Sequence, residues 1–173
     1  GTFDDVNAIS KIAVNTHLAG AAGTATAAII SRLLGGKTDI IMMLNGALAG
    51  LVAITAEPLT PSPLLAILIG AIGSLIMYFG TKFLESKKID DVVGAIPVHM
   101  FAGIFGTLIV PLSNPDTNFG TQLTGVISVC LFSFVLSYIT FRGLKETIGL
   151  RISAQAEKLG TDVAEVGVKA YAI

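Results

Sequence analysis

Five long apolar runs, separated by short polar segments, dominate this sequence of 173 residues. Each run approaches the ~20 residues that a helix needs to cross ~30 Å of hydrocarbon, although the second is short. Barrel strands alternate polar and apolar residues, whereas these runs are continuous, so helices are the spanning elements we expect. The sequence therefore predicts an all-α, polytopic helical membrane protein. Its expected spans are 12–31, 40–56, 64–83, 92–112 and 123–141, within a transmembrane region 1–146 that precedes a cytoplasmic tail, 147–173.

Charge and motif content exclude several classes of function. Charged residues make up 13% of the chain, about half of the ~25% typical of soluble domains. A net charge of −1 and the lack of a basic patch argue against nucleic acid as a partner. The sequence contains no nucleophile elbow, P-loop or paired-cysteine motif, and two histidines are too few to argue a metal site. We therefore expect no enzymatic activity, no cofactor and no metal.

The basic residues predict the orientation of the chain in its membrane. Loops 32–39 and 81–91 and the tail after 141 contain ten of the eleven Lys and Arg residues, and loops 57–63 and 113–122 contain none. Alternate loops lie on opposite faces, and the positive-inside rule makes the basic face cytoplasmic. The N-terminus of this chain is thus expected outside and its C-terminus inside, with Lys11 as the exception. The bilayer is then the expected partner of the spans.

His99 lies within the fourth run, where an ionisable group is expensive to desolvate. Such residues are rare, face a cavity or another helix, and mark pathways for ions or protons. One interpretation places His99 on a route for a small polar solute. The alternative is a histidine that is hydrogen-bonded across a helix interface and serves only packing.

Other polar residues of the runs need partners, since an unpaired polar group in hydrocarbon costs several kcal/mol. We expect Asn15 and Asn45 to form hydrogen bonds between helices. Asp91 is placed to cap the fourth helix or to lie in its first turn, and Pro97 is expected to bend that helix and free a backbone carbonyl. The many Gly and Ala residues of the first two runs indicate close helix packing and say nothing of the solute.

Several segments in fixed order resemble the ammonium transporter family (Amt/Mep/Rh), and the similarity runs nearly from end to end. The similar segments are Val14–Ala19 (VNTHLA), Leu44–Thr55 (LNGALAGLVAIT), Ile89–His99 (IDDVVGAIPVH), Ala102–Leu108 (AGIFGTL), Gly149–Ser153 (GLRIS) and Ala170–Tyr171. Proteins of this family have eleven spans, in two inverted five-helix repeats and a final long helix. This chain resembles spans seven to eleven and the cytoplasmic tail.

The resemblance implies a homotrimer in the cell (plasma) membrane, with a narrow apolar pore in each subunit. It implies that ammonium is deprotonated and that two histidines relay the proton at mid-membrane. His99 matches the second of those histidines, Asp91 matches an acid of the family, and Thr16 is expected to line the pore. Asp91 and Asn45 are expected to support the pore. The N-terminal half of the transporter, which would supply the first histidine and the outer gate, is then an expected partner.

The tail departs from the family pattern Asp-x-x-Glu-His-Gly, because Val166 stands in place of the histidine in the stretch 162–167. In the family this tail contacts PII-type signalling proteins, so binding of such a partner is in question. Two other functions stay open: an ammonium sensor that binds without conducting and signals through its tail, and a structural five-helix module. The principal interpretation is ammonium or ammonia transport.

Overall fold

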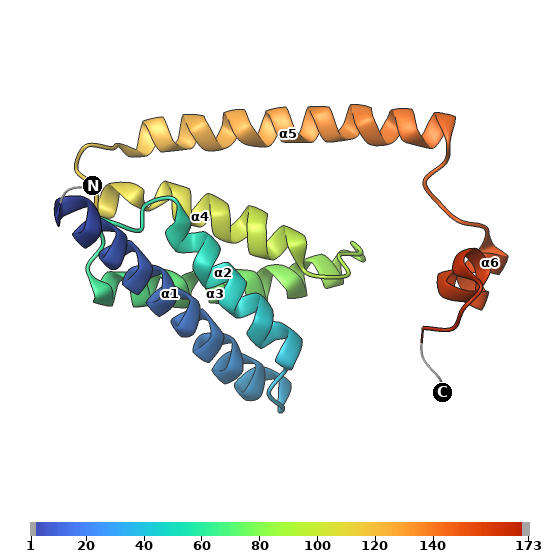
Figure 1. Ribbon diagram of the computed structural model, residues 1–173, viewed down its shortest axis with the longest axis horizontal. Helices are drawn as coiled ribbons and strands as arrows, with labels where there is room; N and C mark the ends of the chain where they lie inside the picture. Colours follow the sequence, from blue (N-terminus) through green and yellow to red (C-terminus); the bar gives the residue numbers. More distant parts are fainter. Residues whose placement is uncertain (1–2, 171–173) are drawn as a thin grey trace. The chain divides into compact units, whose positions relative to one another are not determined.

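The computed structural model describes residues 3–170, except the side chain of Phe3, and every regular element in that range is helical (Figure 1). Tyr171, which contributes to the family resemblance of the tail, lies outside the described residues. The elements are α1 (Phe3–Gly35), α2 (Ile40–Thr55), α3 (Pro63–Ser86), the π-helix η1 (Ile96–Phe101), α4 (Ala102–Leu108), the 3₁₀-helix η2 (Val110–Leu112), α5 (Phe119–Thr147), α6 (Ala154–Leu159) and the π-helix η3 (Asp162–Val166).

Side chains of short polar residues begin several of these helices. The carboxylate of Asp39 accepts a hydrogen bond from the Met42 amide at 3.1 Å, which caps α2. The hydroxyl of Ser62 accepts from the Leu65 amide at 3.3 Å and caps α3, whose first residue is a proline. Such caps satisfy amides that lack a partner within the helix. The polar segments before α2 and α3 therefore fix where these two helices start.

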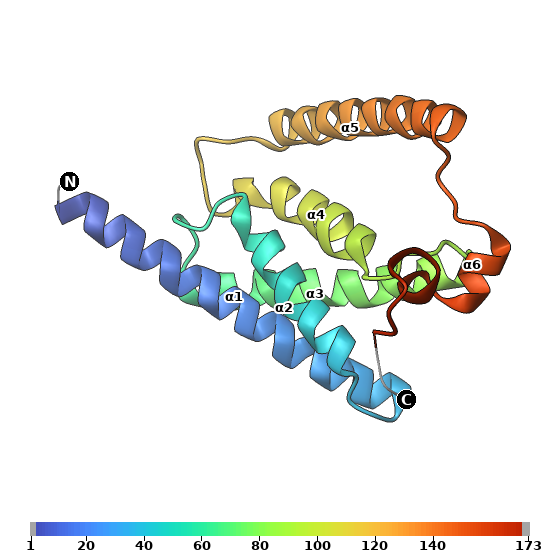
Figure 2. The same cartoon turned by 45° about the vertical axis from the view of Figure 1, so that its right-hand side comes forward.

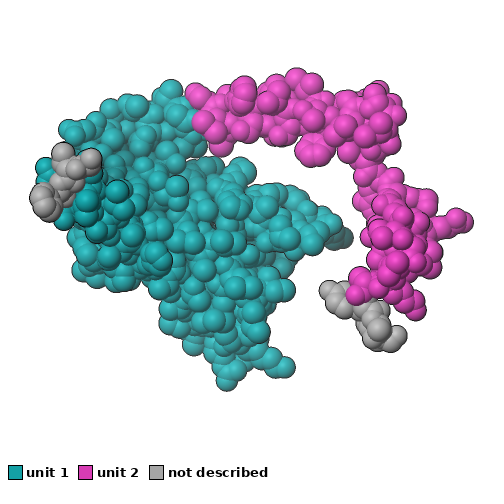
Figure 3. Space-filling model, viewed as in Figure 1, with its two compact units in different colours: residues 1–127 teal, residues 128–173 magenta. Residues whose placement is uncertain are grey.

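The chain divides into two compact units, residues 1–127 and 128–173 (Figure 3). In the first unit α1, α2 and α3 pack against one another, and η1 and α4 pack on α2 and α3 (Figures 1 and 2). The buried core of this unit combines many small residues with larger ones, of which Met77, Ile54 and Val98 are among the most deeply buried.

Small residues let the helices of the first unit approach to backbone contact. A β-carbon on Gly23 of α1 would overlap the carbonyl oxygen of Gly46 in α2. A β-carbon on Gly70 of α3 would overlap the carbonyl oxygen of Ala19 in α1. Membrane helices gain packing energy by this close approach, because lipid offers no hydrophobic drive for their association. The expected close packing of the first two apolar runs is confirmed.

The second unit contains most of α5 and the tail elements α6 and η3. None of the residues of α5 is buried. In the tail, α6 and η3 contact each other, and the carboxylate of Asp162 accepts a hydrogen bond from the Ala170 amide at 2.8 Å. An ion pair joins Arg151 to Glu157 at the start of this segment.

The helices differ in length from the expected spans. In the described range, the helices that are long and apolar enough to cross a membrane are α1, α3 and α5, while Ile40–Thr55 and Ile96–Leu112 are shorter apolar helices. The 16 residues of α2 rise only about 24 Å. The first helix extends well beyond 12–31, and the fourth run was expected from residue 92 but becomes helical only near Ile96. The count of five full spans stays a prediction.

Candidate solute pathway at the fourth apolar helix

The turn that precedes η1 is held by the carboxylate of Asp91. Its Oδ1 accepts a hydrogen bond from the amide of Ala95 at 2.9 Å, and its Oδ2 accepts from the amide of Ile96 at 2.8 Å. Both amides lie at the helix start, where no carbonyl of the helix is in reach and where the dipole favours a negative charge. The expected capping role of Asp91 is confirmed by these contacts.

Asn45 of α2 holds the same turn from the opposite side. Its Nδ2 donates a hydrogen bond to the carbonyl of Val93 at 3.0 Å. The neighbouring Gly94 is buried and has a φ of +74°, a backbone conformation that glycine adopts at little cost. A β-carbon on Gly94 would also lie 2.6 Å from the Nδ2 of Asn45. Asn45 was expected to bond to another helix, whereas its partner is the turn before one.

The carbonyl of Val93 lies in the turn before the helix, and the positive φ of Gly94 separates it from the helical hydrogen-bond pattern. Pro97 lies in the first turn of η1, where an amide has no partner within the helix, so its missing amide hydrogen costs no helical hydrogen bond. The next amide follows the ordinary pattern, since that of Val98 donates to the carbonyl of Gly94 at 3.2 Å. Pro97 was expected to free a carbonyl within the helix, whereas the carbonyl that Asn45 satisfies belongs to the turn before it.

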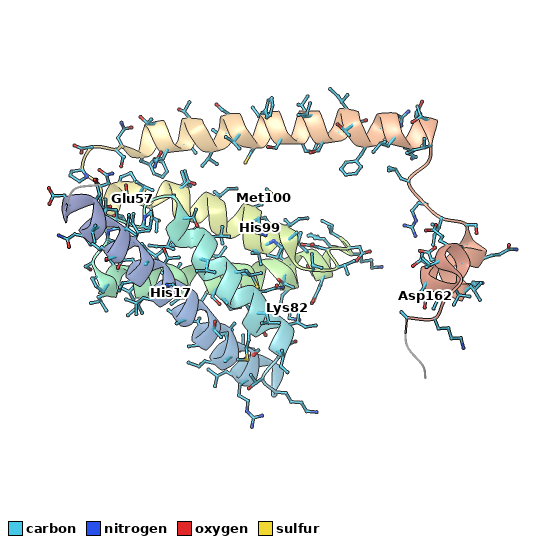
Figure 4. The ribbon with its side chains drawn as sticks, in the orientation of Figure 1. His17, Glu57, Lys82, His99, Met100 and Asp162 are labelled. Atoms are coloured by element: carbon cyan, nitrogen blue, oxygen red, sulfur yellow. The ribbon has the colours of Figure 1, made fainter. Side chains whose placement is uncertain are left out.

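His99 lies in the π-helix η1, two residues after that proline. Its neighbours Pro97 and Val98 are buried, whereas His99 and Met100 are exposed (Figure 4). The amide of Ala102 donates to the carbonyl of Pro97, five residues earlier, as well as to that of His99. Such π-helical turns are rare and are frequent at functional sites. Pro97 was expected to bend the fourth helix, whereas it lies in the first turn of η1, a widened turn that contains His99.

A cavity of about 240 Å³ opens beside this turn. Three carboxylates line it, those of Glu85, Asp90 and Asp91, together with Gly94 and Pro97. Glu85 is paired with Lys82 at 3.0 Å, which reduces the local negative charge. Lys87 and Lys88 precede Asp90 and Asp91 on the same segment, so the formal charges of residues 81–91 balance.

Thr16 and His17 lie on α1, away from this group. Thr16 is half-buried, and within the described range no hydrogen bond links it to His99 or Asp91. The Nδ1 of the exposed His17 donates to the carbonyl of Ala13 at 2.7 Å, within its own helix. Figure 4 shows His17 on α1 and His99 on η1, the π-helix that precedes α4. The structure brings Asn45, Asp91 and the His99 helix together and leaves Thr16 apart.

A polar cluster at the other end of α2 was missing from the sequence prediction. The Oε1 of Glu57 accepts from the amides of Leu59 and Thr60 at 3.1 and 3.2 Å, and its Oε2 accepts from the Nδ2 of Asn114 at 3.0 Å. Glu57 is the only charged residue of the segment 57–63. The hydrogen bonds of Glu57 could have been predicted from this lone charge, because a charged group in a short loop needs polar partners.

Asn15 of α1 is fully buried and lies at the same end of the helix bundle as Glu57. Its Nδ2 donates to the carbonyls of Pro58 and Pro61, at 2.9 Å each. The expected partner was another helix, whereas the observed partners lie in the loop between α2 and α3. Proline carbonyls in such a loop have few other donors, which explains the choice.

Helical spans, small-residue packing and an ionisable residue in an apolar helix define a helical membrane protein. The Ammonium Transporter Family model matches residues 2–171. Ammonium transporter Amt2 of Archaeoglobus fulgidus is 39% identical over 94% of this chain, and Amt1 of Methanocaldococcus jannaschii is 32% identical over 96%. The chain therefore belongs to the ammonium transporter family, a family of transporters rather than enzymes.

Solved structures show the same likeness. A structure described as a sensor Amt protein has a TM-score of 0.84 and 33% identity, covering 91% of this chain and 42% of its own. Mep2 of Candida albicans has a TM-score of 0.77 and 25% identity, covering 91% of this chain and 39% of its own. The chain covers 39% of the Archaeoglobus relative and 46% of the Methanocaldococcus relative. It thus spans less than half of the length of these relatives.

Proposed function

We propose that this chain, joined to the segments that its relatives have in addition, conducts ammonium or ammonia across a cell membrane. The observation that supports this most is the environment of His99. Within a family member, an ionisable side chain lies exposed on an apolar helix whose adjoining residues 97 and 98 are buried. Ionisable groups at such positions face cavities or partner helices rather than lipid. The exposed face of η1 is then the wall of the pathway.

The chemistry of ammonium favours an imidazole at such a wall. An ammonium ion that loses its water in an apolar pore pays a large solvation penalty. Transfer of a proton from ammonium to a neutral imidazole leaves uncharged ammonia, which crosses the apolar region at lower cost. The ring takes a proton at one nitrogen while it donates from the other, so His99 suits a proton relay with a second histidine from the rest of the protein.

Asn45 and Asp91 support this pathway by fixing the turn from which η1 starts. Thr16 is proposed as a further lining residue on the strength of the family resemblance alone. The proposed orientation puts the N-terminus of this chain outside and the tail inside, following the distribution of Lys and Arg. The assembled protein is a homotrimer in this proposal.

A non-conducting ammonium sensor is the second candidate, and two observations favour it. One of the similar structures is described as a sensor Amt protein. In the tail, Val166 occupies the position where the family pattern has histidine. A changed tail bears on the partner that it contacts, including any PII-type protein, more than on the pore.

One pair of measurements separates the two functions. The complete protein is reconstituted on a solid-supported membrane, and current is recorded after an ammonium jump, with ammonium binding measured on the same preparation. Transport predicts both binding and a current that rises with ammonium concentration. Binding without current would identify a sensor and contradict the transport proposal. If the protein shows neither binding nor current, both functions are contradicted and the structural module is the function that is left.

A further inference from the structure

Gly80 of α3 lies directly against the helix that carries His99. A β-carbon on Gly80 would lie 2.5 Å from the Cδ2 of Phe101 and 3.2 Å from the Cβ of Pro97. A separation of 2.5 Å between carbon atoms is far inside their ~3.5–4.0 Å contact distance. Only the absence of a side chain at residue 80 allows η1 to sit as close to α3 as it does.

The two residues that rest on Gly80 stand on either side of His99 in the sequence. Pro97 precedes it by two positions and Phe101 follows it by two. Helical residues four apart share a face, whereas a residue two positions from each projects from the other side. With Pro97 and Phe101 seated on α3, His99 is turned away from α3. This agrees with the exposure of His99 and with the 49% exposed Met100 beside it.

The contact of Pro97 and Phe101 with Gly80 matters more in a π-helix than it would in a regular α-helix. The turn from Ile96 to Phe101 has the wider hydrogen-bond spacing, and it returns to α geometry at Ala102. Wide turns are uncommon because local geometry alone does not favour them, so their persistence depends on surrounding packing. In the first unit that packing comes from α3 on one side and from Asn45 and Gly94 before the turn.

We propose that Gly80 is a positioning residue for His99: the absent side chain at residue 80 sets the rotation of η1 and so directs the imidazole into the pathway. This inference rests on the proposed function for its effect on transport. Its structural part, the orientation of the imidazole, is independent of whether the protein conducts. Replacement of Gly80 by Ala is expected to push Phe101 and Pro97 away from α3, and so to change the direction in which the imidazole of His99 points.

The test uses the complete protein in lipid, with histidine side chains labelled by ¹⁵N and ammonium-evoked current recorded in parallel. The His99 signals are assigned by their loss in His99→Ala. Gly80→Ala is expected to shift the His99 ring signals and to lower the current about tenfold or more, since misplacement by ~1 Å costs up to ~100-fold at a reacting group. Gly143→Ala on α5 is the control, because its β-carbon would meet nothing within 4 Å.

A compensating change distinguishes positioning from general damage. In the double variant Gly80→Ala/Phe101→Ala the ring atoms that the new methyl group would strike are gone, and the His99 signals and most of the current are expected to return. If Gly80→Ala leaves the His99 signals unchanged, the inference is overturned whatever happens to the current. Loss of current in Gly80→Ala without recovery in the double variant would also overturn it.

Two further outcomes are covered by the same experiment. If Gly80→Ala does not reach the membrane, Phe101→Ala alone is used, because it removes the contact of residue 101 with Gly80 without adding a methyl group. This variant must shift the His99 signals for the inference to stand. If the parent protein carries no ammonium current, the transport proposal fails, while the His99 signals of the variants still decide whether Gly80 orients the imidazole.

Discussion

The side-chain amide of Asn45 satisfies the backbone carbonyl of Val93, in the turn from which the His99 helix starts. Its Nδ2 donates to Val93 at 3.0 Å, and Val93 stands four residues before Pro97. A residue of α2 thereby fixes the turn that precedes the helix carrying His99. Asn45 and Val93 lie 48 positions apart in the sequence.

We expect Asn45→Asp to be at least as damaging as Asn45→Ala. Aspartate has nearly the same shape as asparagine, but its carboxylate cannot donate to the Val93 carbonyl and would repel it. Loss of the donor leaves a carbonyl unsatisfied, at a cost of about 1–3 kcal/mol. Thermal unfolding of the detergent-solubilised protein measures the effect. Parent-like stability of Asn45→Asp would show that the Asn45–Val93 hydrogen bond contributes nothing.

Asp91 should show a graded response to substitution. Asp91→Asn keeps one acceptor oxygen for two amides and loses the charge that the helix N-terminus favours, which is worth about 0.3–1 kcal/mol. Asp91→Ala leaves the amides of Ala95 and Ile96 both without their acceptor. Stability is therefore expected in the order parent, Asp91→Asn, Asp91→Ala. An Ala variant as stable as the Asn variant would contradict the capping role.

The contact between Gly23 and Gly46 predicts a strong response to a single methyl group. Gly23→Ala puts its β-carbon onto the Gly46 carbonyl, and overpacking of this kind costs about 1–3 kcal/mol. Gly143→Ala on α5 is the matched control, since a β-carbon there meets nothing within 4 Å. Alanine also has the higher helix propensity, so the control should be neutral or slightly stabilising. Equal melting temperatures of the two variants would refute the close packing of α1 and α2.

Particular residues show what the sequence allowed us to predict. The cap at Asp91 and the close packing of glycines follow from local rules, and both are present. The partner of Asn45 was not predictable, because it depends on where α2 passes in space. The late start of the fourth helix follows from the +74° φ of Gly94, and many glycines in helices lack such a conformation.

Asn15 and Gly80 illustrate the same limit. A buried amide must find acceptors, but whether these are helix or loop carbonyls is decided by the path of the 58–61 segment. Gly80 resembles the other glycines of its apolar run, and only the position of Phe101 and Pro97 distinguishes it. The roles of His99, Thr16, Asn45 and Asp91 in solute movement stay predictions.

The tail offers a prediction on pH. Hydrogen bonds from the amides of Ala170 and Val163 lower the pKa of Asp162 below its ordinary value, which is about 3.9. A lowered pKa means that the carboxylate stabilises the η3 turn above pH ~3.9 and that this contribution is lost as pH falls through the lowered pKa. Titration of the Ala170 amide signal in the complete, ¹⁵N-labelled protein should give a midpoint below ~3.9. A midpoint at or above that value would contradict the hydrogen bond.

The central claim is that His99 handles the solute or its proton, and a comparison of two histidine variants tests it most directly. Ammonium-evoked current is recorded on solid-supported membranes for the complete protein, for His99→Ala, and for His17→Ala, which removes the exposed imidazole of α1. The account predicts that His99→Ala abolishes the current or alters its pH dependence, while His17→Ala retains the parent response. A His99→Ala protein with the parent current and pH dependence would contradict it.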